Sequence, residues 1–286
     1  MPADPSTFIG ATSEDTRHLE LDQRRTDVLA IGSQLAYGRV GLNASQPVYQ
    51  NAGLRVAAIP TTILSVLPHY PSVHQTHLPA DWIADALDDL TRSGALERLR
   101  AITVGYVATA AQAHAIAAWY QRQSRSTIPL ILDPTFGDVG LGFYNDPAIV
   151  RALREALLPE AAGLTPNLFE LAHLTGTDPE SLTELAAIEA AARSLLEPSM
   201  DWVVVTGIRS AAATDDIAAD SIAELIVTHG SRRLLIHPQF AHTPAGAGDT
   251  FTAALTARLI QGISLTEAAQ FAAEETARQI RHGATR

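Results

Sequence analysis

Residues 242–251 read HTPAGAGDTF and are followed by a long alanine-rich segment with helical periodicity. Gly246, Ala247 and Gly248 leave room for the backbone to approach a ligand closely. A helix is expected over residues 248–261, so its first backbone N–H groups point out of the loop without partners. Because such a helix start attracts anionic groups, the stretch predicts a phosphate-binding loop.

Asp249, at the start of this helix, has two interpretations. An aspartate in this place is commonly a helix N-cap. It can also be a catalytic base beside an anion hole. The loop lacks the Lys and Ser/Thr of a P-loop and has no G-x-G-x-x-G spacing, so neither nucleotide-binding motif applies. The choice depends on the rest of the chain.

Length and composition favour one large α/β domain. The chain has 286 residues, is 47% hydrophobic and carries a net charge of −11. That charge argues against nucleic acid or an anionic membrane as partner. Without cysteine there are no disulfides, thiolate metal sites or cysteine nucleophiles. The N-terminus is charged and no apolar run is long enough to span a membrane, so a cytoplasmic protein is expected.

Lysine is absent, and all 20 basic residues are arginine. The chain therefore has no P-loop lysine, no Schiff-base lysine and no lysine general base. If it handles a phosphate donor, the charge of the transferred group has to be met by Mg²⁺, backbone N–H groups, arginine or histidine.

Short apolar strands alternate with helices along residues 26–286, whereas residues 1–25 are polar and expected to form a disordered extension. Strands are predicted at 27–33, 54–61, 101–107, 128–133, 162–165 and 202–206, with a hairpin at 221–228 and 233–238. Helices are predicted at 43–53, 80–93, 110–124, 147–158, 168–174, 182–196, 248–261 and 265–281. This order predicts a mainly parallel sheet covered on both faces. Residues 61–77, with two prolines and no clean period, are expected to form a loop or lid.

Polar residues collect where the predicted strands end, which is where open parallel sheets bind ligands. These ends are Ser33, Gly105-Tyr106, Asp133, residues 165–167, Thr206-Gly207 and the loop at 246–249. A binding site is therefore expected along this edge.

Two segments at this edge carry acidic residues. Residues 132–144, LDPTFGDVGLGFY, contain Asp133 and Asp138 in a glycine-rich run. Residues 165–176, TPNLFELAHLTG, place Asn167 and Glu170 on one face of a helix start. This pair is either a capping box or a group that orders the waters of Mg²⁺. His74 and His77 form an H-x-x-H spacing without a third ligand nearby, which disfavours zinc.

The order of these motifs resembles the ribokinase-like superfamily and, within it, the pyridoxal kinases. The resemblance covers about residues 28–280 and rests on IGSQLAYGRVGLNA, Gly105-Tyr106, DPTFGDVGLGFY, TPNLFELAHLTG, VVVTG and AGAGDTF. It implies a single-domain, three-layer α/β sandwich. It also implies an ATP-dependent kinase that phosphorylates the 5′-hydroxymethyl group of pyridoxal in vitamin B6 salvage, with pyridoxine and pyridoxamine as further candidate substrates.

The resemblance also implies roles for individual residues. Asp249 would be the base, and Gly246, Ala247 and Gly248 the anion hole. Substrate would be lined by Ser33, His69, Tyr106, Tyr144 and Asp249. ATP would be bound by Asp133, Thr165, Asn167, Glu170, Thr206, His237 and Phe240. The metal group would be Asp133, Asp138 and Glu170, acting on Mg²⁺. The family also suggests a homodimer.

Two departures from the family pattern leave alternatives open. Residues 64–70 read LSVLPHY where the family often has F-S-N-H-T-x-Y, so Val66, Leu67 and Pro68 replace polar residues. Thr206 stands where some members carry lysine. The alternatives are a related kinase for another small alcohol, such as hydroxymethylpyrimidine or a sugar, and a B6- or nucleotide-binding relative without turnover.

Overall fold

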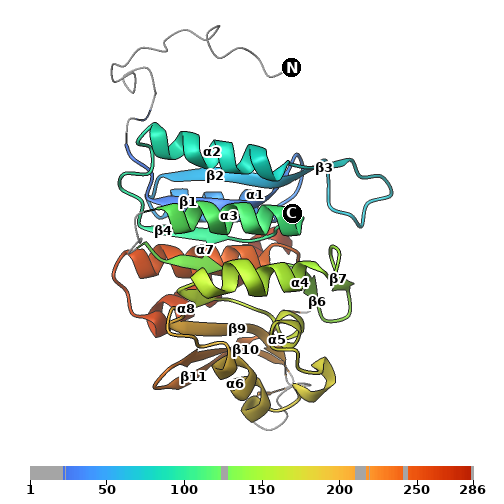
Figure 1. Ribbon diagram of the computed structural model, residues 1–286. Coiled ribbons are helices and arrows are strands. Elements are labelled where there is room, and N and C mark those ends of the chain that lie inside the picture. Colours follow the sequence, from blue (N-terminus) through green and yellow to red (C-terminus); the bar gives the residue numbers. More distant parts are fainter. Residues whose placement is uncertain are drawn as a thin grey trace, which may run out of the picture.

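A nine-stranded sheet organises the described part of the chain, and its six central strands are parallel (Figure 1). The computed structural model describes residues 22, 24–123, 128–209, 217–218, 220–240 and 244–284. Across the sheet the strand order is β11-β10-β9-β8-β5-β4-β1-β2-β3. The parallel strands are β1 (Val28–Leu35), β2 (Val56–Leu64), β4 (Ala101–Val104), β5 (Leu130–Leu132), β8 (Gly163–Leu164) and β9 (Trp202–Arg209). Antiparallel strands extend both edges: β3 (Gln75–His77) at one, β10 (Ser221–Thr228) and β11 (Arg232–Pro238) at the other.

Helices cover both faces of the sheet, which confirms the predicted three-layer α/β sandwich (Figure 1). One face carries α2 (Ala80–Arg92), α3 (Ala110–Arg122), α4 (Ile149–Ala152) with a π turn at Leu153–Leu157, α5 (Leu168–Thr175) and α6 (Leu185–Ser194). The other carries α1 (Leu42–Asn51), α7 (Ala247–Ile260) and α8 (Leu265–Ala284). Within β1, Leu29 and Ile31 join the first core and Val28 and Ala30 the second. Because both faces are buried, this strand reads as a continuous apolar run.

The predicted loop at residues 61–77 is partly wrong. β2 continues to Leu64, and β3 pairs with it antiparallel, which leaves residues 65–74 as the connecting loop. Pro60 lies inside β2, opposite Gly32 where the register between β1 and β2 shifts. A proline is tolerated in a strand at such an irregularity. The two prolines of the predicted loop, Pro68 and Pro71, do lie in the 65–74 loop, so only the ends of the prediction were wrong.

A small hairpin of β6 (Gly137–Asp138) and β7 (Gly142–Phe143) was not predicted. Its turn uses positive φ angles at Gly140 and Gly142. The Phe143 ring packs against Phe169 of α5, with ring centroids 5.0 Å apart. The hairpin is thereby fixed to α5.

The predicted extension at residues 1–25 lies mostly outside the described residues. Of those that are described, Asp22 pairs with Arg55 at 2.9 Å and Arg25 pairs with Glu97 at 3.1 Å. The contacts of the domain therefore begin slightly before residue 26. Across the described ranges, no helix combines the length and apolar character needed to cross a membrane.

Buried Gln112 on α3 joins three segments near the site. Its amide nitrogen donates to the carbonyl oxygens of Thr61 (2.8 Å) and Leu78 (2.7 Å). Its amide oxygen accepts from the backbone N–H of Ala108 at 2.9 Å. The ends of β2 and α2 are thus tied to the start of α3.

Replacing Gln112 with leucine should destabilise the protein by about 3 kcal/mol, because buried groups at Leu78 and Ala108 lose their partner. Urea unfolding monitored by circular dichroism measures this change. Gln121→Leu, on the exposed face of the same helix, is the matched control and should change stability by less than about 0.5 kcal/mol. Equal effects of the two substitutions would contradict the role of Gln112.

Candidate active site

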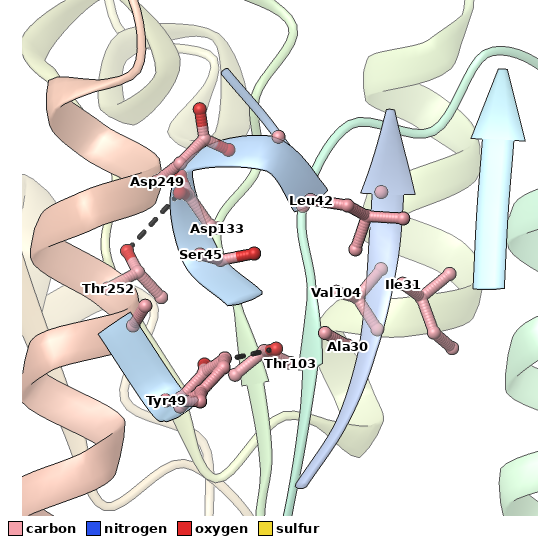
Figure 2. Close-up of a pocket in the computed structure, with 14 residues that line it drawn as sticks. Ala30, Ile31, Leu42, Ser45, Tyr49, Thr103, Val104, Asp133, Asp249 and Thr252 are labelled. Atoms are coloured by element: carbon pink, nitrogen blue, oxygen red, sulfur yellow. Dashed lines mark hydrogen bonds between the residues drawn. The ribbon is translucent and has the colours of Figure 1, made fainter. Parts of the chain in front are cut away.

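A small cavity, open at its mouth, lies where β1, β4 and β5 end beside α1 and α7. Figure 2 shows two carboxylates, Asp133 and Asp249, at one end of this cavity and Tyr49 with Thr103 at the other. Apolar side chains of Ala30, Ile31, Leu42 and Val104 line one side, and Ser45 and Thr252 add further polar groups. The sequence predicted that polar groups gather at this edge of the sheet, and Asp133 and Asp249 do lie together there.

Asp249 is not an N-cap, so that interpretation is wrong. α7 begins at Ala247, its N-cap is Gly246, and Asp249 is the third residue of the helix. The cap provides no side-chain hydrogen bond, and the Asp249 N–H bonds to its own carboxylate, so the N–H groups of Ala247 and Gly248 are the ones that could meet an anion. Gly246 has φ 92°, and a Cβ there would overlap the carbonyl oxygen of Arg39. Only glycine allows this close approach between the two loops.

The backbone N–H of Gly41 donates a hydrogen bond to the Asp249 carboxylate. Gly41 is the N-cap of α1 and has φ 54°. The starts of α1 and α7 therefore converge on one carboxylate, which the sequence did not reveal. Burial raises the pKa of Asp249, while the Gly41 N–H favours its charged form. The result is a half-buried base with a fixed orientation.

Asp133 follows β5 and is buried, with 8% of its surface exposed. Burial, together with the nearby charge of Asp249, raises the pKa of Asp133 to about 8. The Thr252 hydroxyl donates to its Oδ2 at 3.2 Å. Two acidic groups thus share one cavity at the N-terminal end of α7.

Asn167 and Glu170 form the capping box that was one of the two interpretations of this pair. The Asn167 side chain accepts from the Glu170 N–H, and the Glu170 carboxylate accepts from the Asn167 N–H, both at 2.9 Å. The other Glu170 oxygen accepts from the Phe136 N–H at 3.2 Å. Burial, and secondarily the charge of Asp133, raises the pKa of Glu170. Glu170 therefore fixes the backbone that follows Asp133, and an effect on a metal would pass through that backbone or through water.

The site suits a hard cation that takes oxygen ligands. Among the described residues, Asp133, Asp249 and Glu170 have no ion pair with arginine or histidine. In the same part of the chain no three carboxylate, histidine or cysteine side chains are grouped closely enough to hold a metal by themselves. Mg²⁺ commonly uses one or two carboxylates together with waters and substrate phosphates. Asp133 fits that manner of binding.

Ser33 and Tyr106 lie at the ends of neighbouring strands. Ser33 is buried, and Gly41 packs so closely on it that a Cβ would overlap its hydroxyl. The Tyr106 carbonyl accepts from the Thr61 hydroxyl at 2.7 Å.

The other two predicted substrate residues differ in their surroundings. Burial raises the pKa of Tyr144, and the negative charges of Asp138 and Glu170 add to it, so Tyr144 lies within electrostatic reach of the acidic groups. His69 is exposed in the 65–74 loop, stacks on Tyr70 and does not line the cavity.

The residues predicted to bind ATP are spread over several strand ends. Thr165 is buried, and its hydroxyl pairs with that of Thr252 at 2.8 Å. The Thr206 N–H donates to the Pro166 carbonyl at 2.9 Å. None of the predicted nucleotide residues other than Asp133 lines the cavity.

His237, Phe240 and Asp138 lie away from the cavity. His237, on β11, bonds to buried Glu224 at 2.5 Å, and its pKa is raised because this partner outweighs the opposing effect of burial. The Phe240 ring faces Arg281 at 5.7 Å. Asp138, in β6, is half-buried and accepts from the Val139 N–H at 2.7 Å. A role for these three residues depends on what binds beside them.

Comparisons with known proteins agree with this geometry. A family model described as phosphomethylpyrimidine kinase matches residues 50–285. The chain is 41% identical, over 246 residues, to the pyridoxine/pyridoxal/pyridoxamine kinase of Bordetella avium, covering 85% of this chain and 81% of that protein. The chain belongs to the phosphomethylpyrimidine kinase family.

Solved structures of pyridoxal kinases are similar to this member of the family. The enzyme of Leishmania donovani, in complex with ADP and pyridoxamine, has a TM-score of 0.79 and 26% identity, with 89% of each chain covered. The enzyme of Entamoeba histolytica shares the fold, with a TM-score of 0.81 and 21% identity over 91% of this chain and 90% of that one. The resemblance to the ribokinase-like pyridoxal kinases is therefore confirmed.

Four polar residues of the cavity were missed in the sequence: Ser45, Tyr49, Thr103 and Thr252. Ser45 and Tyr49 are spaced i, i+4 on α1, so they lie on one face of that helix. The predicted helix already implied that Ser45 and Tyr49 share a face. Nothing in the sequence indicated that this face turns toward Asp249. Thr252 is likewise one turn beyond Asp249 on α7.

The raised pKa of Asp133 predicts how stability depends on pH without metal. In the folded protein Asp133 keeps its proton up to about pH 8, whereas an unfolded aspartate loses it near pH 4. Because the folded state binds more protons between these values, stability should fall as pH rises from about 4 to about 8. Asp133→Asn should therefore be more stable than the wild type at pH 8, by more than about 1 kcal/mol, with the gain shrinking toward pH 4.

Urea unfolding at pH 5 and pH 8 in the presence of a chelator tests this dependence. Asp85→Asn, on the exposed surface of α2, is the control and should show no gain at either pH. A variant of Asp133 that is less stable than the wild type at pH 8 would show that the buried carboxylate is not a source of instability.

Proposed function

We propose that this protein is an ATP-dependent kinase that phosphorylates the 5′-hydroxymethyl group of pyridoxal in vitamin B6 salvage, with pyridoxine and pyridoxamine as further substrates. The observation that carries the proposal is the placement of Asp249. Its carboxylate lies in the first turn of α7, beside unpaired N–H groups and a second carboxylate. The relatives support it, since the Bordetella protein is named for all three vitamers and the Leishmania enzyme binds ADP and pyridoxamine.

Asp249 acts as the general base in this proposal. Burial raises its pKa, so the carboxylate takes a proton from a substrate hydroxyl more readily than an exposed aspartate would. The Gly41 N–H holds the carboxylate in one orientation while the substrate oxygen attacks the γ-phosphorus. The N–H groups of Ala247 and Gly248, at the start of α7, face the negative charge that builds up on the transferred group.

Asp133 is the residue proposed to hold Mg²⁺, together with phosphate oxygens of ATP. A bound Mg²⁺ supplies positive charge to the phosphates, as the chain has no lysine to do so. Glu170 and Asn167 support this arrangement by fixing the backbone at Phe136 and Gly137. Asp138 is proposed to add negative charge at the edge of the same site.

The remaining residues are proposed to enclose the two substrates. Ser33, Tyr106 and Tyr144 would contact the pyridine ring, with His69 reaching it from the 65–74 loop. Thr165, Thr206, His237 and Phe240 would lie on the nucleotide side, Thr165 through its backbone because its hydroxyl is already bonded. We further propose a cytoplasmic homodimer, as in the family resemblance.

A second candidate substrate is hydroxymethylpyrimidine. The family model is described by a kinase of a related pyrimidine, phosphomethylpyrimidine, and Val66, Leu67 and Pro68 make the 65–74 loop less polar than the pyridoxal kinase pattern. Both substrates are hydroxymethyl heterocycles, so the same base and anion hole could serve either one.

A direct assay separates these candidates. The protein is incubated with Mg-ATP and each of pyridoxal, pyridoxine, pyridoxamine and hydroxymethylpyrimidine, and phosphorylated products are quantified by chromatography. The proposal expects the highest kcat/KM for a B6 vitamer. A higher kcat/KM for hydroxymethylpyrimidine would assign the second function. If no substrate gave a product, the protein would be a binding protein without turnover.

Asp249→Asn should lower kcat by about 10²- to 10⁴-fold, the usual loss when a general base is removed. The amide oxygen can still accept the Gly41 N–H, so the melting temperature and the KM for ATP should change little. Steady-state kinetics and differential scanning calorimetry measure both effects. A kcat within about fivefold of the wild type would leave Asp249 with a structural role only.

The absence of lysine predicts how the aldehyde product is held. Pyridoxal phosphate is commonly trapped on proteins as a lysine imine, but no side-chain amine exists in these 286 residues. Borohydride treatment of the protein with its product should therefore leave no pyridoxyl adduct on any internal peptide, as checked by peptide mass mapping. A stoichiometric adduct on an internal peptide would contradict this prediction, because it would show that the product binds covalently to a residue other than lysine.

A further inference from the structure

Thr252 and Thr256 lie one helical turn apart on α7 and are both buried, with exposed fractions of 4% and 0%. The residues around them on this helix are alanines and a leucine. A threonine lowers helix propensity relative to alanine, and a buried hydroxyl is costly unless it is hydrogen-bonded. The partners of these two hydroxyls therefore show why threonine is present.

The two hydroxyls have different partners. The Thr256 hydroxyl donates to the carbonyl of Thr252 at 2.7 Å, a bond within the helix, and is also hydrogen-bonded to the buried Tyr49 side chain of α1. The Thr252 hydroxyl donates to Asp133 Oδ2 at 3.2 Å and pairs with the Thr165 hydroxyl at 2.8 Å (Figure 2 shows the bond to Asp133). The Thr252 hydroxyl thus joins α7 to the ends of β5 and β8.

The direction of this chain of bonds follows from the number of hydrogens. A hydroxyl has one hydrogen to donate. When Asp133 is ionised, as it would be beside a cation, it only accepts, so the hydrogen of Thr252 points to Asp133 and the bond between the two threonines is donated by Thr165. Thr165 therefore holds Thr252 in the orientation that serves Asp133.

Each of the two carboxylates in the cavity has its own donor. Gly41 donates to Asp249, and Thr252 donates to Asp133. Asp133 also has a side-chain hydrogen bond with Thr135, and the first turn of α7 lies near it, since a Cβ on Gly248 would be 4.0 Å from Oδ2. The Asp133 carboxylate is thus held by Thr252 and Thr135 beside the start of α7.

We propose that Thr252, supported by Thr165, is a positioning residue that fixes the Asp133 carboxylate for the divalent cation bound with the nucleotide. The inference rests on the proposed function, because it assigns Asp133 to that cation. Residues that orient a metal ligand from behind typically change metal affinity by about 10- to 100-fold when they are removed. Such an effect is expected on the metal and not on pyridoxal.

The test compares three substitutions of similar size. Thr252→Val removes the hydroxyl and keeps the shape, Thr252→Ser keeps the hydroxyl, and Thr256→Val is a matched control on the same buried face. Binding of Mn²⁺ to each protein in the presence of saturating ADP is measured by electron paramagnetic resonance. The Mg²⁺ activation constant, the KM values for pyridoxal and ATP, and the melting temperature are measured alongside.

Thr252→Val is expected to weaken Mn²⁺ binding, and to raise the Mg²⁺ activation constant, by about 10-fold, the lower end of the usual range, with the KM for pyridoxal within about twofold. Thr252→Ser and Thr256→Val should bind Mn²⁺ within about twofold of the wild type. If Thr252→Val does not fold, Thr165→Val should shift Mn²⁺ affinity in the same direction by a smaller factor.

Unchanged Mn²⁺ affinity in Thr252→Val, or an equal loss in Thr256→Val, would overturn the proposal, as would a wild-type protein that binds no Mn²⁺ with ADP. A wild-type protein that binds Mn²⁺ and ADP but phosphorylates no B6 vitamer would overturn the proposed function instead. In that case the comparison of the variants still decides the role of Thr252.

Discussion

The site depends on keeping two carboxylates, Asp133 and Asp249, close together in a largely buried cavity. Burial disfavours the charge on each, and the two charges repel each other. Hydrogen bonds from Gly41 and Thr252 orient them but supply no positive charge. A cationic partner would offset this repulsion, which fits the proposed use of a metal–nucleotide complex by a chain without lysine.

The sheet explains why these groups meet although they are distant in the chain. Parallel strands end at one edge, so Ser33, Tyr106, Asp133 and Thr165 come from four strands but lie along one line. α1 and α7 cover the same face and both begin at that edge. The fold thus places two helix starts, and the anion-binding N–H groups they carry, over the strand ends.

Much of the fold could be predicted because buried parallel strands and helix signals are local. The apolar run of β1, the capping residues of α5 and the glycine-rich start of α7 each depend on neighbouring residues only. β2 beyond Pro60 and the hairpin of β6 and β7 could not, because a bulge and an aromatic contact with α5 decide them. In the site, Asp249 was identified from its loop, whereas its bond from Gly41 and the bond of Asp133 to Thr252 join residues about 120 or more positions apart.

Two glycines of this chain, Gly163 and Gly137, each face a large aromatic ring, which limits how the sequence can change in evolution. A Cβ on Gly163 would lie 2.1 Å from the Trp202 ring, and one on Gly137 would lie 2.3 Å from Phe169. In each pair, the ring occupies the space that a side chain on the glycine would need. At Gly163 the ring has to become smaller before the glycine can be replaced, so the order of the two substitutions is constrained. At Gly137 the carbonyl oxygen of Gly142, 2.7 Å from such a Cβ, has to move as well. Relatives that carry a side chain at either glycine position are therefore expected to carry a smaller residue opposite it.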